Sequence, residues 1–353
     1  MLQRVTKSLR STWNRWGIRR IYGAAIILAG VTALGGLSLM DGLVSQVSAQ
    51  DVTYFRIGTS RPGSHLFNIA AEIGNAISNP TGGADCAPTD ACGVPGVVGM
   101  AQTTAGAIES LQQLREGGLD AAIVQADLVA LAAQGKGPFK EAGPDPDLRA
   151  IATVGDVALQ VIVPAASPIK TLADLKGKRV ATNPAESDGA ISISQIFTTL
   201  GLTSRRVKLL PMELSEAASQ LAAGKVDAIA IVERPDLAEI TSIAEHMPIR
   251  LIPVGAAEKA KIGTDRRDLL LAHLPAGTDA TSGETDTFIV PVLFVVTTKT
   301  DNTVAHELAR TLVVPQRDTK LTSNPAASKP DAHVESTVIP LHPGVEQLLG
   351  TTN

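Results

Sequence analysis

Aromatic residues are scarce in this chain of 353 residues, where they make up 3% of the sequence. Both tryptophans, Trp13 and Trp16, lie near the N-terminus, and Tyr54 is the only tyrosine after residue 49. Platforms for sugars and cages for quaternary amines are built from aromatic faces. The composition therefore argues against both kinds of site and favours a small polar ligand that is held by hydrogen bonds.

Signatures of catalysis and of metal binding are also lacking. The turn Gly58-Thr59-Ser60-Arg61-Pro62 has no closing glycine for a nucleophile elbow. Ser60 stands where a dinucleotide-binding turn needs its middle glycine. The histidines show no H-E-x-x-H or comparable spacing. They are His65, His246, His273, His306, His333 and His342. We therefore predict that the chain is not an enzyme and holds no metal and no cofactor.

The first 49 residues differ from the rest. They carry six basic residues and no acid before Asp41, then an apolar run from Ile21 to Met40 and the small-residue stretch Val47-Ser48-Ala49. This order predicts a secretory signal that is cleaved after Ala49. The alternative is an uncleaved membrane anchor, because the run is about as long as a bilayer requires. Both interpretations place the remaining chain outside the inner membrane, in the periplasm.

The net charge changes when these residues are set aside. Residues 50–353 keep 25 of the 31 Lys and Arg and 34 of the 35 Asp and Glu, which leaves a net charge of −9. A field of that sign does not recruit nucleic acid or anionic lipid. An anionic ligand would therefore need hydrogen-bond donors that are placed locally.

Cysteine occurs twice, at Cys86 and Cys92, in the loop "GGADCAPTDACGVPG". In an oxidising compartment, an even pair in a loop rich in glycine and proline is most simply a disulfide. A metal site is the alternative, and no histidine lies near the pair in sequence. We therefore predict a structural disulfide, which would close a short loop.

Strand-like and helical patterns alternate along the chain. "TYFRIG" precedes apolar residues at helical spacing from Leu66 to Ile77, and "KRVAT" precedes a similar series from Ile193 to Leu200. Alternation of this kind is typical of an α/β fold with largely parallel sheets.

An internal repeat suggests two similar lobes. "LREGGLDAAIV" (114–124) and "LAAGKVDAIAIV" (221–232) share the pattern L-x-x-G-x-[LV]-D-A, in which a helix ends near a glycine and a buried strand follows. Chance likeness between two ordinary units is the alternative. A loop rich in proline and aspartate, and the long apolar segments near residues 157–163 and 287–298, indicate strands that cross between lobes. We predict a first lobe from 51–157 and 290–353, a second lobe from 158–289, and a ligand cleft between them.

Three predicted helices begin with small polar residues, in "TSRPGSH" (59–65), "AQTTAGAIESL" (101–111) and "NPAESDGAIS" (183–192). Helix N-termini bind anions through unpaired N–H groups. Ordinary helix capping is the alternative for each. Arg61 and Arg234 could clamp a carboxylate or lie solvated. His65 could donate to a ligand or be an ordinary polar residue.

Four motifs resemble those of a known family, the TAXI family of extracytoplasmic solute-binding receptors that serve TRAP-type transporters. Gly58, Thr59 and Gly63 match its glycine-rich opening turn, and Phe67 falls near its aromatic position. "TTAGAIESLQQLREGGLDAAIVQADLV", "SPIKTLADLKGKRVATNPAES" and "VIPLHPG" are similar to its later segments, in the same order. Together they span about Phe55 to Leu349, essentially the whole chain after the leader.

The resemblance implies a two-lobed, type II-like periplasmic binding protein fold. It also implies a receptor that captures glutamate, glutamine or a 2-oxoglutarate-like acid and delivers it to TRAP membrane subunits. We expect a monomer. A secreted hydrolase-like enzyme and a membrane-anchored sensing domain are the alternatives. Arg61 would suit an extra ligand carboxylate, whereas Glu186 and Asp188 would oppose one. The predicted ligand-binding residues are Thr59, Ser60, Arg61, Gly63, Ser64, His65, Phe67, Thr103, Thr104, Gly106, Gln125, Asn183, Ser187 and Arg234.

Overall fold

The computed structural model divides the chain into two units, Met1–Asp51 and Val52–Asn353. The structure describes residues 52–62, 64–79, 93–234, 238–262, 266–274, 284–313 and 338–350, all in the second unit. The predicted leader, Gly63 and the predicted disulfide of Cys86 and Cys92 lie outside the described residues. No helix in the described ranges is long and apolar enough to cross a bilayer.

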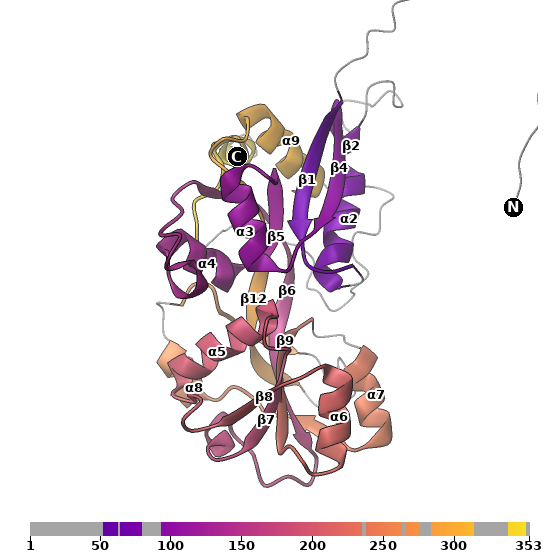
Figure 1. The fold of residues 1–353 in the computed structure, drawn as a ribbon, viewed down its shortest axis with the longest axis vertical. Helices are drawn as coiled ribbons and strands as arrows, with labels where there is room; N and C mark the ends of the chain where they lie inside the picture. The colour runs from indigo at the N-terminus through magenta and orange to yellow at the C-terminus, as the bar shows by residue number, and fades with distance from the viewer. Residues whose placement is uncertain are drawn as a thin grey trace, which may run out of the picture. The chain divides into compact units, whose positions relative to one another are not determined.

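The second unit has an α/β fold with two lobes, as the alternating pattern predicts (Figure 1). Two long antiparallel strands run through both lobes: β6 (Leu148–Pro164) and β12 (Thr285–Thr297). The other elements of lobe I are β1 (Thr53–Thr59), α2 (His65–Ile77), β2 (Ser78–Asn79), β3 (Val94–Pro95), β4 (Val97–Thr103), α3 (Ala107–Glu116), β5 (Ala121–Gln125), α4 (Ala126–Gln134), the 3-10 turn η1 (Gly137–Phe139), α9 (Asn302–Val313) and α10 (Pro343–Gly350).

Lobe II repeats the alternation of strand and helix. Its elements are the 3-10 turn η2 (Leu172–Leu175), β7 (Arg179–Thr182), α5 (Asp188–Leu200), β8 (Lys208–Pro211), α6 (Leu214–Ala222), β9 (Ala228–Glu233), α7 (Ala238–His246), β10 (Ile249–Leu251), α8 (Ala256–Ile262) and β11 (Leu270–Leu274). Thr171 and Asp174 form a capping box at the start of η2.

One sheet connects the two lobes. Its strand order is β4-β1-β5-β12-β6-β9-β7-β8, with β10 beside β6 and β11 beside β12. Strands β1, β4 and β5 are parallel to one another, as are β7, β8 and β9. The predicted lobe boundaries fall inside the crossing strands, where Ala158 pairs with Ile289. We keep those boundaries as a proposal.

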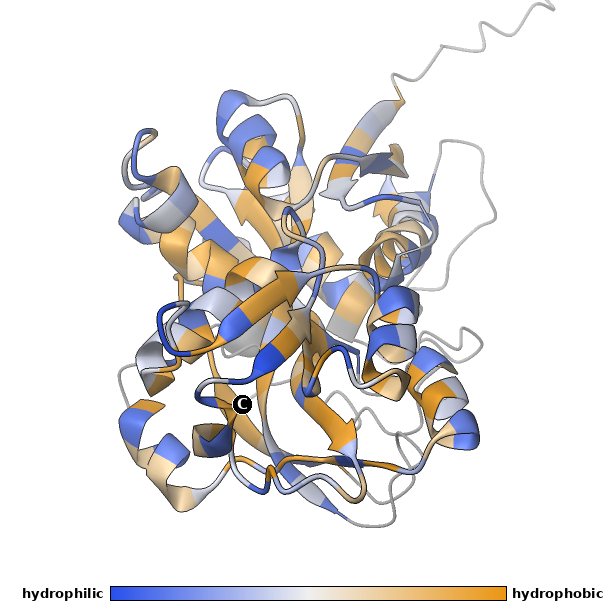
Figure 2. Ribbon diagram, turned by 60° about the horizontal axis from the view of Figure 1, so that its bottom comes forward, coloured by the Kyte–Doolittle hydropathy of each residue, from blue (hydrophilic) through white to orange (hydrophobic). Residues whose placement is uncertain are grey.

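The core follows from the buried faces of these strands. Figure 2 shows apolar strands inside a layer of helices whose outward faces are largely hydrophilic. A first cluster of buried residues runs through both lobes, with Ile57 and Phe294 fully buried. A second cluster lies on the opposite face of the lobe II strands, where Ile229 and Ile231 meet Leu221 of α6 and Ile240 of α7. Burial of this apolar surface is the main force that holds both lobes together.

The internal repeat is the same ion-paired unit, built once in each lobe. In lobe I, the Arg56 Nε donates to Asp120 Oδ2 at 2.8 Å, and its Nη2 donates to Gly117 O at 3.1 Å. In lobe II, the Arg179 Nε donates to Asp227 Oδ2 at 3.1 Å, and its Nη2 donates to Gly224 O at 2.8 Å.

In each copy the arginine lies in the first strand, in the middle of β1 for Arg56 and at the start of β7 for Arg179. The aspartate directly precedes the strand that follows the helix. A glycine with positive φ completes the turn, at +80° for Gly117 and +65° for Gly224. The two sequence segments are therefore equivalent units of two similar lobes.

Candidate functional site

The candidate site is the region where the carboxyl ends of six strands face one another across the lobes. Strands β1, β4 and β5 end at Thr59, Thr103 and Gln125. Three contacts between the lobes start at or just after these ends, from Arg61, Ala107 and Gln125. Ligands of open α/β sheets bind outside the carboxyl ends of strands. The predicted residues of lobe I lie at these ends or in the first turns of the helices that follow.

In lobe I, Thr104 organises the strand ends. Its hydroxyl donates to Thr59 O at 2.9 Å and lies 2.8 Å from Ser110 Oγ. The Gly106 N–H donates to Thr104 Oγ1 at 3.1 Å. Thr59 is 1% exposed, and its hydroxyl has no hydrogen-bond partner among the described residues. A buried hydroxyl without a partner is costly, and a polar ligand could supply one. Thr103, which pairs with Thr59 in register, is exposed.

The start of α2 is capped from within its own segment. Ser64 is the N-cap residue, and its Oγ accepts from the Phe67 N–H at 3.2 Å. Ser60 Oγ lies 2.8 Å from Ser64 Oγ. His65 and Phe67 are half-buried residues of the first turn. Ordinary capping therefore accounts for the serine at this helix start, and a ligand role for these residues stays a prediction.

Arg61 reaches the other lobe. Its Nη1 lies 3.7 Å from Glu213 Oε1, just before α6, and both side chains are exposed. An exposed pair of this kind contributes little stability. Burial raises the pKa of Glu233, and the positive charge of Arg61 opposes that rise. Arg61 therefore lies against acids of lobe II, and its predicted role as a carboxylate clamp stays a prediction.

A carboxylate of lobe II caps the N-terminus of α3. Gly106 is the N-cap residue and offers no side chain, and Asp188 of lobe II accepts from the Ala107 N–H at 2.9 Å. A Cβ on Gly106 would lie 2.9 Å from Asp188 Oδ1, so glycine makes room for this carboxylate. A carboxylate at a helix N-terminus is favourable because of the helix dipole. Burial raises the pKa of Asp188, and this hydrogen bond opposes the rise.

The start of α5 is again capped locally. Ser187 is the N-cap residue, and its Oγ accepts from the Ala190 N–H at 3.2 Å. Two of the three predicted helix starts thus carry an ordinary serine cap, and the third holds Asp188. A group of the chain thus caps one N–H at each of these starts, and the binding of an anionic ligand by the three helix N-termini stays a prediction.

Buried amides lie on both sides of the lobe boundary. The Ser192 hydroxyl of α5 donates to Gln125 Oε1 at 2.8 Å, and both residues are buried. Asn183 Oδ1 accepts from the Val232 N–H at 3.0 Å, and its Nδ2 donates to Glu233 Oε1 at 3.2 Å. These bonds hold Gln125 and Asn183 in fixed orientations, one in each lobe.

Two acidic groups near the lobe boundary, Glu233 and Asp156, were missed by sequence reasoning. Burial raises the pKa of Glu233 to about 7, with the charges of Asp188 and Glu239 adding to the effect. Burial alone raises the pKa of Asp156 to about 6. Asp156 lies two residues before Ala158, which pairs with Glu233, so the two acids are on the same face of the sheet. The position of Glu233 at the end of a buried strand was the available signal.

Next to Glu233, Arg234 is half-buried, and its carbonyl accepts from Gln160 Nε2 at 3.1 Å. Gln160 is 1% exposed, and its Oε1 has no partner among the described residues.

Another buried acid, Asp127, lies in the first turn of α4 on the lobe I side. Burial raises its pKa to about 6, and the nearby Ser192 hydroxyl opposes the rise. Its Oδ1 accepts from the Leu128 N–H at 2.9 Å within the first turn of α4, whose N-cap residue is Gln125.

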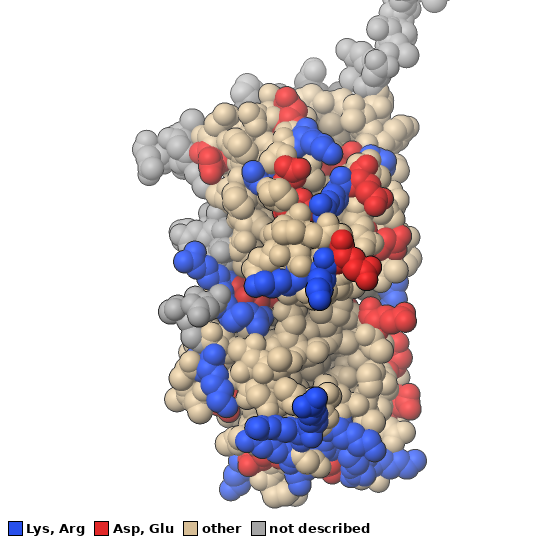
Figure 3. Space-filling view, turned by 60° about the vertical axis from the view of Figure 1, so that its left-hand side comes forward, with Lys and Arg blue, Asp and Glu red and all other residues tan. Residues whose placement is uncertain are grey.

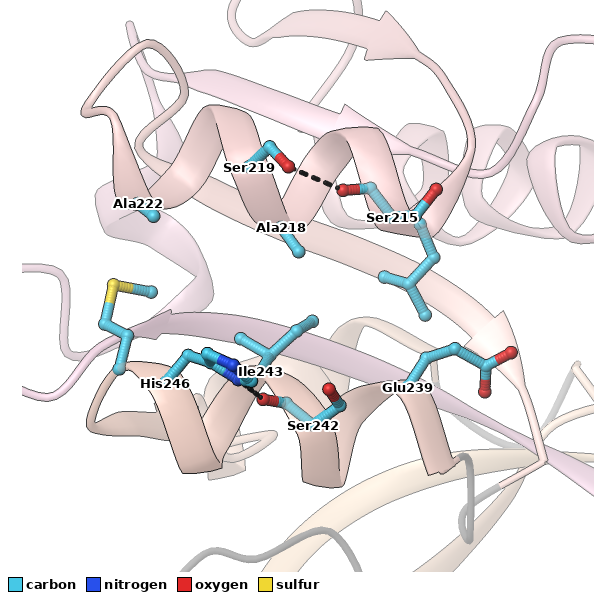
Figure 4. Close-up of a pocket in the computed structure, with 10 residues that line it drawn as sticks. Ser215, Ala218, Ser219, Ala222, Glu239, Ser242, Ile243 and His246 are labelled. Atoms are coloured by element: carbon cyan, nitrogen blue, oxygen red, sulfur yellow. Dashed lines mark hydrogen bonds between the residues drawn. The ribbon is translucent and has the colours of Figure 1, made fainter.

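A groove of about 400 Å³ lies elsewhere, between α6 and α7 (Figure 4). Its floor is apolar, with Leu214, Ala218 and Ile243, and its edges carry Ser215, Glu239 and His246. None of the predicted ligand-binding residues lines it.

Solved structures with a detectable likeness are distant. The periplasmic aliphatic sulphonate binding protein SsuA from Escherichia coli is 17% identical over 67% of this chain and 64% of that chain, with a TM-score of 0.38. The probable amino-acid ABC transporter extracellular-binding protein YtmK from Bacillus subtilis is 15% identical over 74% of this chain and 91% of that chain, with a TM-score of 0.40. A full-length mutant of BenM is 16% identical over 87% and 81%, with a TM-score of 0.42. Likeness at this level assigns no ligand and no partner.

The family is established by a separate match that covers most of the chain. The model of the NMT1-like family matches residues 57–349, from the middle of β1 to the last helix. This range contains both lobes, both crossing strands and every strand end of the candidate site. The chain therefore belongs to the NMT1-like family.

Proposed function

We propose that this protein is an exported solute-binding receptor, which closes its two lobes on a small amino acid and delivers it to the membrane subunits of a TRAP-type transporter. The observation that carries the proposal is the arrangement of strand ends. The polar ends of parallel strands from both lobes meet there, and among the described residues few hydrogen bonds and one exposed ion pair join the lobes at this place. Few contacts between lobes permit the opening and closing that capture and release require.

The charges at this place favour a ligand with an ammonium group over a dicarboxylate. Glu233 and Asp188 belong to lobe II, and Asp156 lies in β6 beside the lobe boundary; burial raises the pKa of each. An ammonium group would offset the cost of ionising these carboxyls, whereas a second carboxylate would increase it. Arg61 of lobe I is the cation that could receive the single carboxylate of an amino acid. Buried acceptors such as Gln160 Oε1 would suit an N–H donor.

A thermal-shift screen of the purified protein tests the ligand class. We expect an amino acid to raise the unfolding temperature, and 2-oxoglutarate, succinate and sugars to leave it unchanged. Binding of a ligand to the folded state raises stability in proportion to the logarithm of its concentration above Kd. A shift with dicarboxylates and none with any amino acid would contradict the proposal.

Calorimetry sharpens this test through proton release. An ammonium group beside Glu233 lowers the pKa of that carboxyl from about 7, so binding near neutral pH should expel a proton. The binding enthalpy should then depend on the ionisation enthalpy of the buffer. The Glu233→Gln variant should bind more weakly and lose this dependence. Glu216→Gln, an exposed change on α6, is the matched control and should keep both.

A further inference from the structure

One end of lobe II carries a dense group of basic side chains. The strands β7, β8 and β9 begin at this end, opposite the strand ends of the candidate site. The segments that precede them are 165–179, 201–208 and 223–228, here called the basic end. They lie side by side. The Gly177 N–H donates to Arg206 O at 2.6 Å, which joins the first two segments, and the Asp227 N–H donates to Arg179 O at 2.8 Å, which joins the third to the first. Figure 3 shows a band of Lys and Arg at the lobe II end of the molecule.

The charge of the basic end is opposite to that of the rest of the protein. Its basic residues are Lys170, Lys176, Lys178, Arg179, Arg205, Arg206, Lys208 and Lys225, and its acids are Asp174 and Asp227. Eight cations against two acids give +6, whereas residues 50–353 as a whole carry −9. The remainder of these residues therefore carries −15. Separation of charge on this scale creates a local positive field on an acidic protein.

Most of these cations are exposed and form no ion pair. Lys170, Lys176, Arg205, Arg206, Lys208 and Lys225 are exposed, and within the described residues no acid pairs with them or with the half-buried Lys178.

The two acids of the basic end have other partners. Asp227 pairs with Arg179. Asp174 accepts from the Lys170 and Thr171 N–H groups in the capping box. Seven of the eight cations therefore form no ion pair within the described part of the chain, and the basic end keeps a net charge of +6.

The composition of this surface is unlike that of a protein interface. The three segments contain no Phe, Tyr, Trp or Met, and five of the eight cations are lysines. Protein interfaces are depleted of lysine and rely on aromatic and arginine anchors in well-packed pockets. Lysines on loop tips attract a diffuse negative surface instead, and clusters of four to eight Lys and Arg are typical of contact with anionic lipid headgroups.

We propose that the basic end of lobe II binds the surface of an anionic lipid membrane. The contact is electrostatic, because these segments have no large apolar side chain that could insert between lipids. In this orientation, the strand ends of the candidate site lie at the opposite end of lobe II and face away from the lipid. The net negative charge of the chain predicted no attraction to anionic lipid, and the clustering of cations at one end alters that expectation locally.

Co-sedimentation of the full chain with vesicles tests this proposal. One vesicle contains equal parts phosphatidylglycerol and phosphatidylcholine, and the other contains phosphatidylcholine alone. We expect binding to the anionic vesicle to exceed binding to the neutral one, and the excess to vanish between about 50 mM and about 500 mM NaCl. The neutral vesicle measures any binding through the apolar N-terminal run, which is common to all samples.

Matched variants locate the contact. The triple variant Lys176→Gln, Lys208→Gln, Lys225→Gln should bind the anionic vesicle at least about tenfold more weakly. The control triple Lys136→Gln, Lys140→Gln, Lys299→Gln removes the same charge from exposed positions of lobe I and should bind like the unaltered protein.

The proposal is wrong if the unaltered protein binds both vesicles equally, or if the two triples bind alike. Tighter binding to duplex DNA than to the anionic vesicle would also overturn it. The salt titration of the unaltered protein decides the question even if the first triple is unstable.

Discussion

The two lobes share one structural unit but differ at both of its ends. Each lobe holds an arginine in one strand that pairs with an aspartate just before another strand, and the same set of donor and acceptor atoms recurs. At the carboxyl ends of its strands, lobe I presents Thr59 and Gln125, whereas lobe II presents Glu233 and Asp188. The two lobes therefore share the geometry of the Arg–Asp ion pair, but they differ in the polar and acidic side chains at their strand ends.

This difference shows which interactions fix the fold and which remain adjustable. The Arg–Asp pairs join strands within a lobe, far from the lobe boundary, so both lobes need them. Among the described residues, the side chains at the strand ends form few hydrogen bonds to the backbone of the sheet. They can therefore differ between the lobes without loss of the fold. Loops at the ends of rigid elements are where function concentrates. The following four predictions test this comparison, from the largest expected effect to the smallest.

The first prediction concerns the acid of lobe II that has no acidic counterpart in lobe I. The pKa of Glu233 rises from 4.5 to about 7 through burial. Between these values the folded state holds a proton that the unfolded state has lost, so the free energy of unfolding falls as pH rises from about 4.5 to about 7. The fall should amount to about 3 kcal/mol. Urea unfolding across this range should show it, and Glu233→Gln should remove it.

Asp156 and Asp127 act in the same direction, since burial raises the pKa of each to about 6. The Glu233→Gln variant should therefore keep a smaller decline at lower pH. Glu216→Gln, which alters an exposed side chain, should reproduce the full decline. An unchanged curve for Glu233→Gln would show that this carboxyl ionises normally.

The second prediction concerns equivalent strand positions, Gly58 in R-I-G-T and Ala181 in R-V-A-T. A Cβ on Gly58 would collide with Leu119 Cδ1 and lie 3.2 Å from Ser110 Oγ. Gly58→Ala should therefore cost about 1–3 kcal/mol through overpacking. The reverse change, Ala181→Gly, should cost about 1 kcal/mol through lost contacts and greater backbone freedom. Urea denaturation gives both values, and a stabilising Gly58→Ala would show that Leu119 can move aside freely.

The third prediction breaks the shared ion pairs one at a time. Asp120→Asn and Asp227→Asn should each lower the unfolding temperature by a few degrees, and by similar amounts, because each acid accepts from the same set of arginine donors. The exposed Glu116→Gln is the control. A large effect in one lobe and none in the other would mean that the two pairs differ in role.

The fourth prediction concerns the contact between the lobes at Asp188. Asp188→Ala removes the acceptor of the Ala107 N–H, so hydrogen exchange at that amide should quicken by about tenfold, the equivalent of one hydrogen bond. Global stability should change little. Glu186→Ala, an exposed change in the same loop, should leave the amide protected. Equal exchange in both variants would show that the lobe contact does not persist in solution.

Much of the fold was predictable from local pattern. Alternating strands and helices, the crossing strands and the repeated L-x-x-G-x-[LV]-D-A segment depend on periodicity and on glycine at helix ends, which act over short distances. The sequence also named Thr59, Gln125 and Asn183 as candidate ligand-binding residues, and the structure places them at or directly after strand ends. The predicted clamp of Arg61 and the ligand itself stay predictions.

The partners of the strand-end groups were not predictable. Asp188 looked like a residue opposed to a ligand, yet it caps α3 of the other lobe, 81 residues away in sequence. The raised pKa of Glu233 depends on burial by elements that pack only in three dimensions. The basic end was not predictable either, because its cations come from three loops that meet only through parallel strand pairing in the folded protein.

The register of the crossing strands has an evolutionary consequence. Ala158 of β6 and Ile289 of β12 are direct partners, so the chain leaves the first half and re-enters it at neighbouring points about 5 Å apart. A segment whose ends meet in this way can be exchanged without stretching what remains. A different second half could be grafted onto an unchanged first half, and new recognition could arise by replacement of a cassette as well as by point substitution.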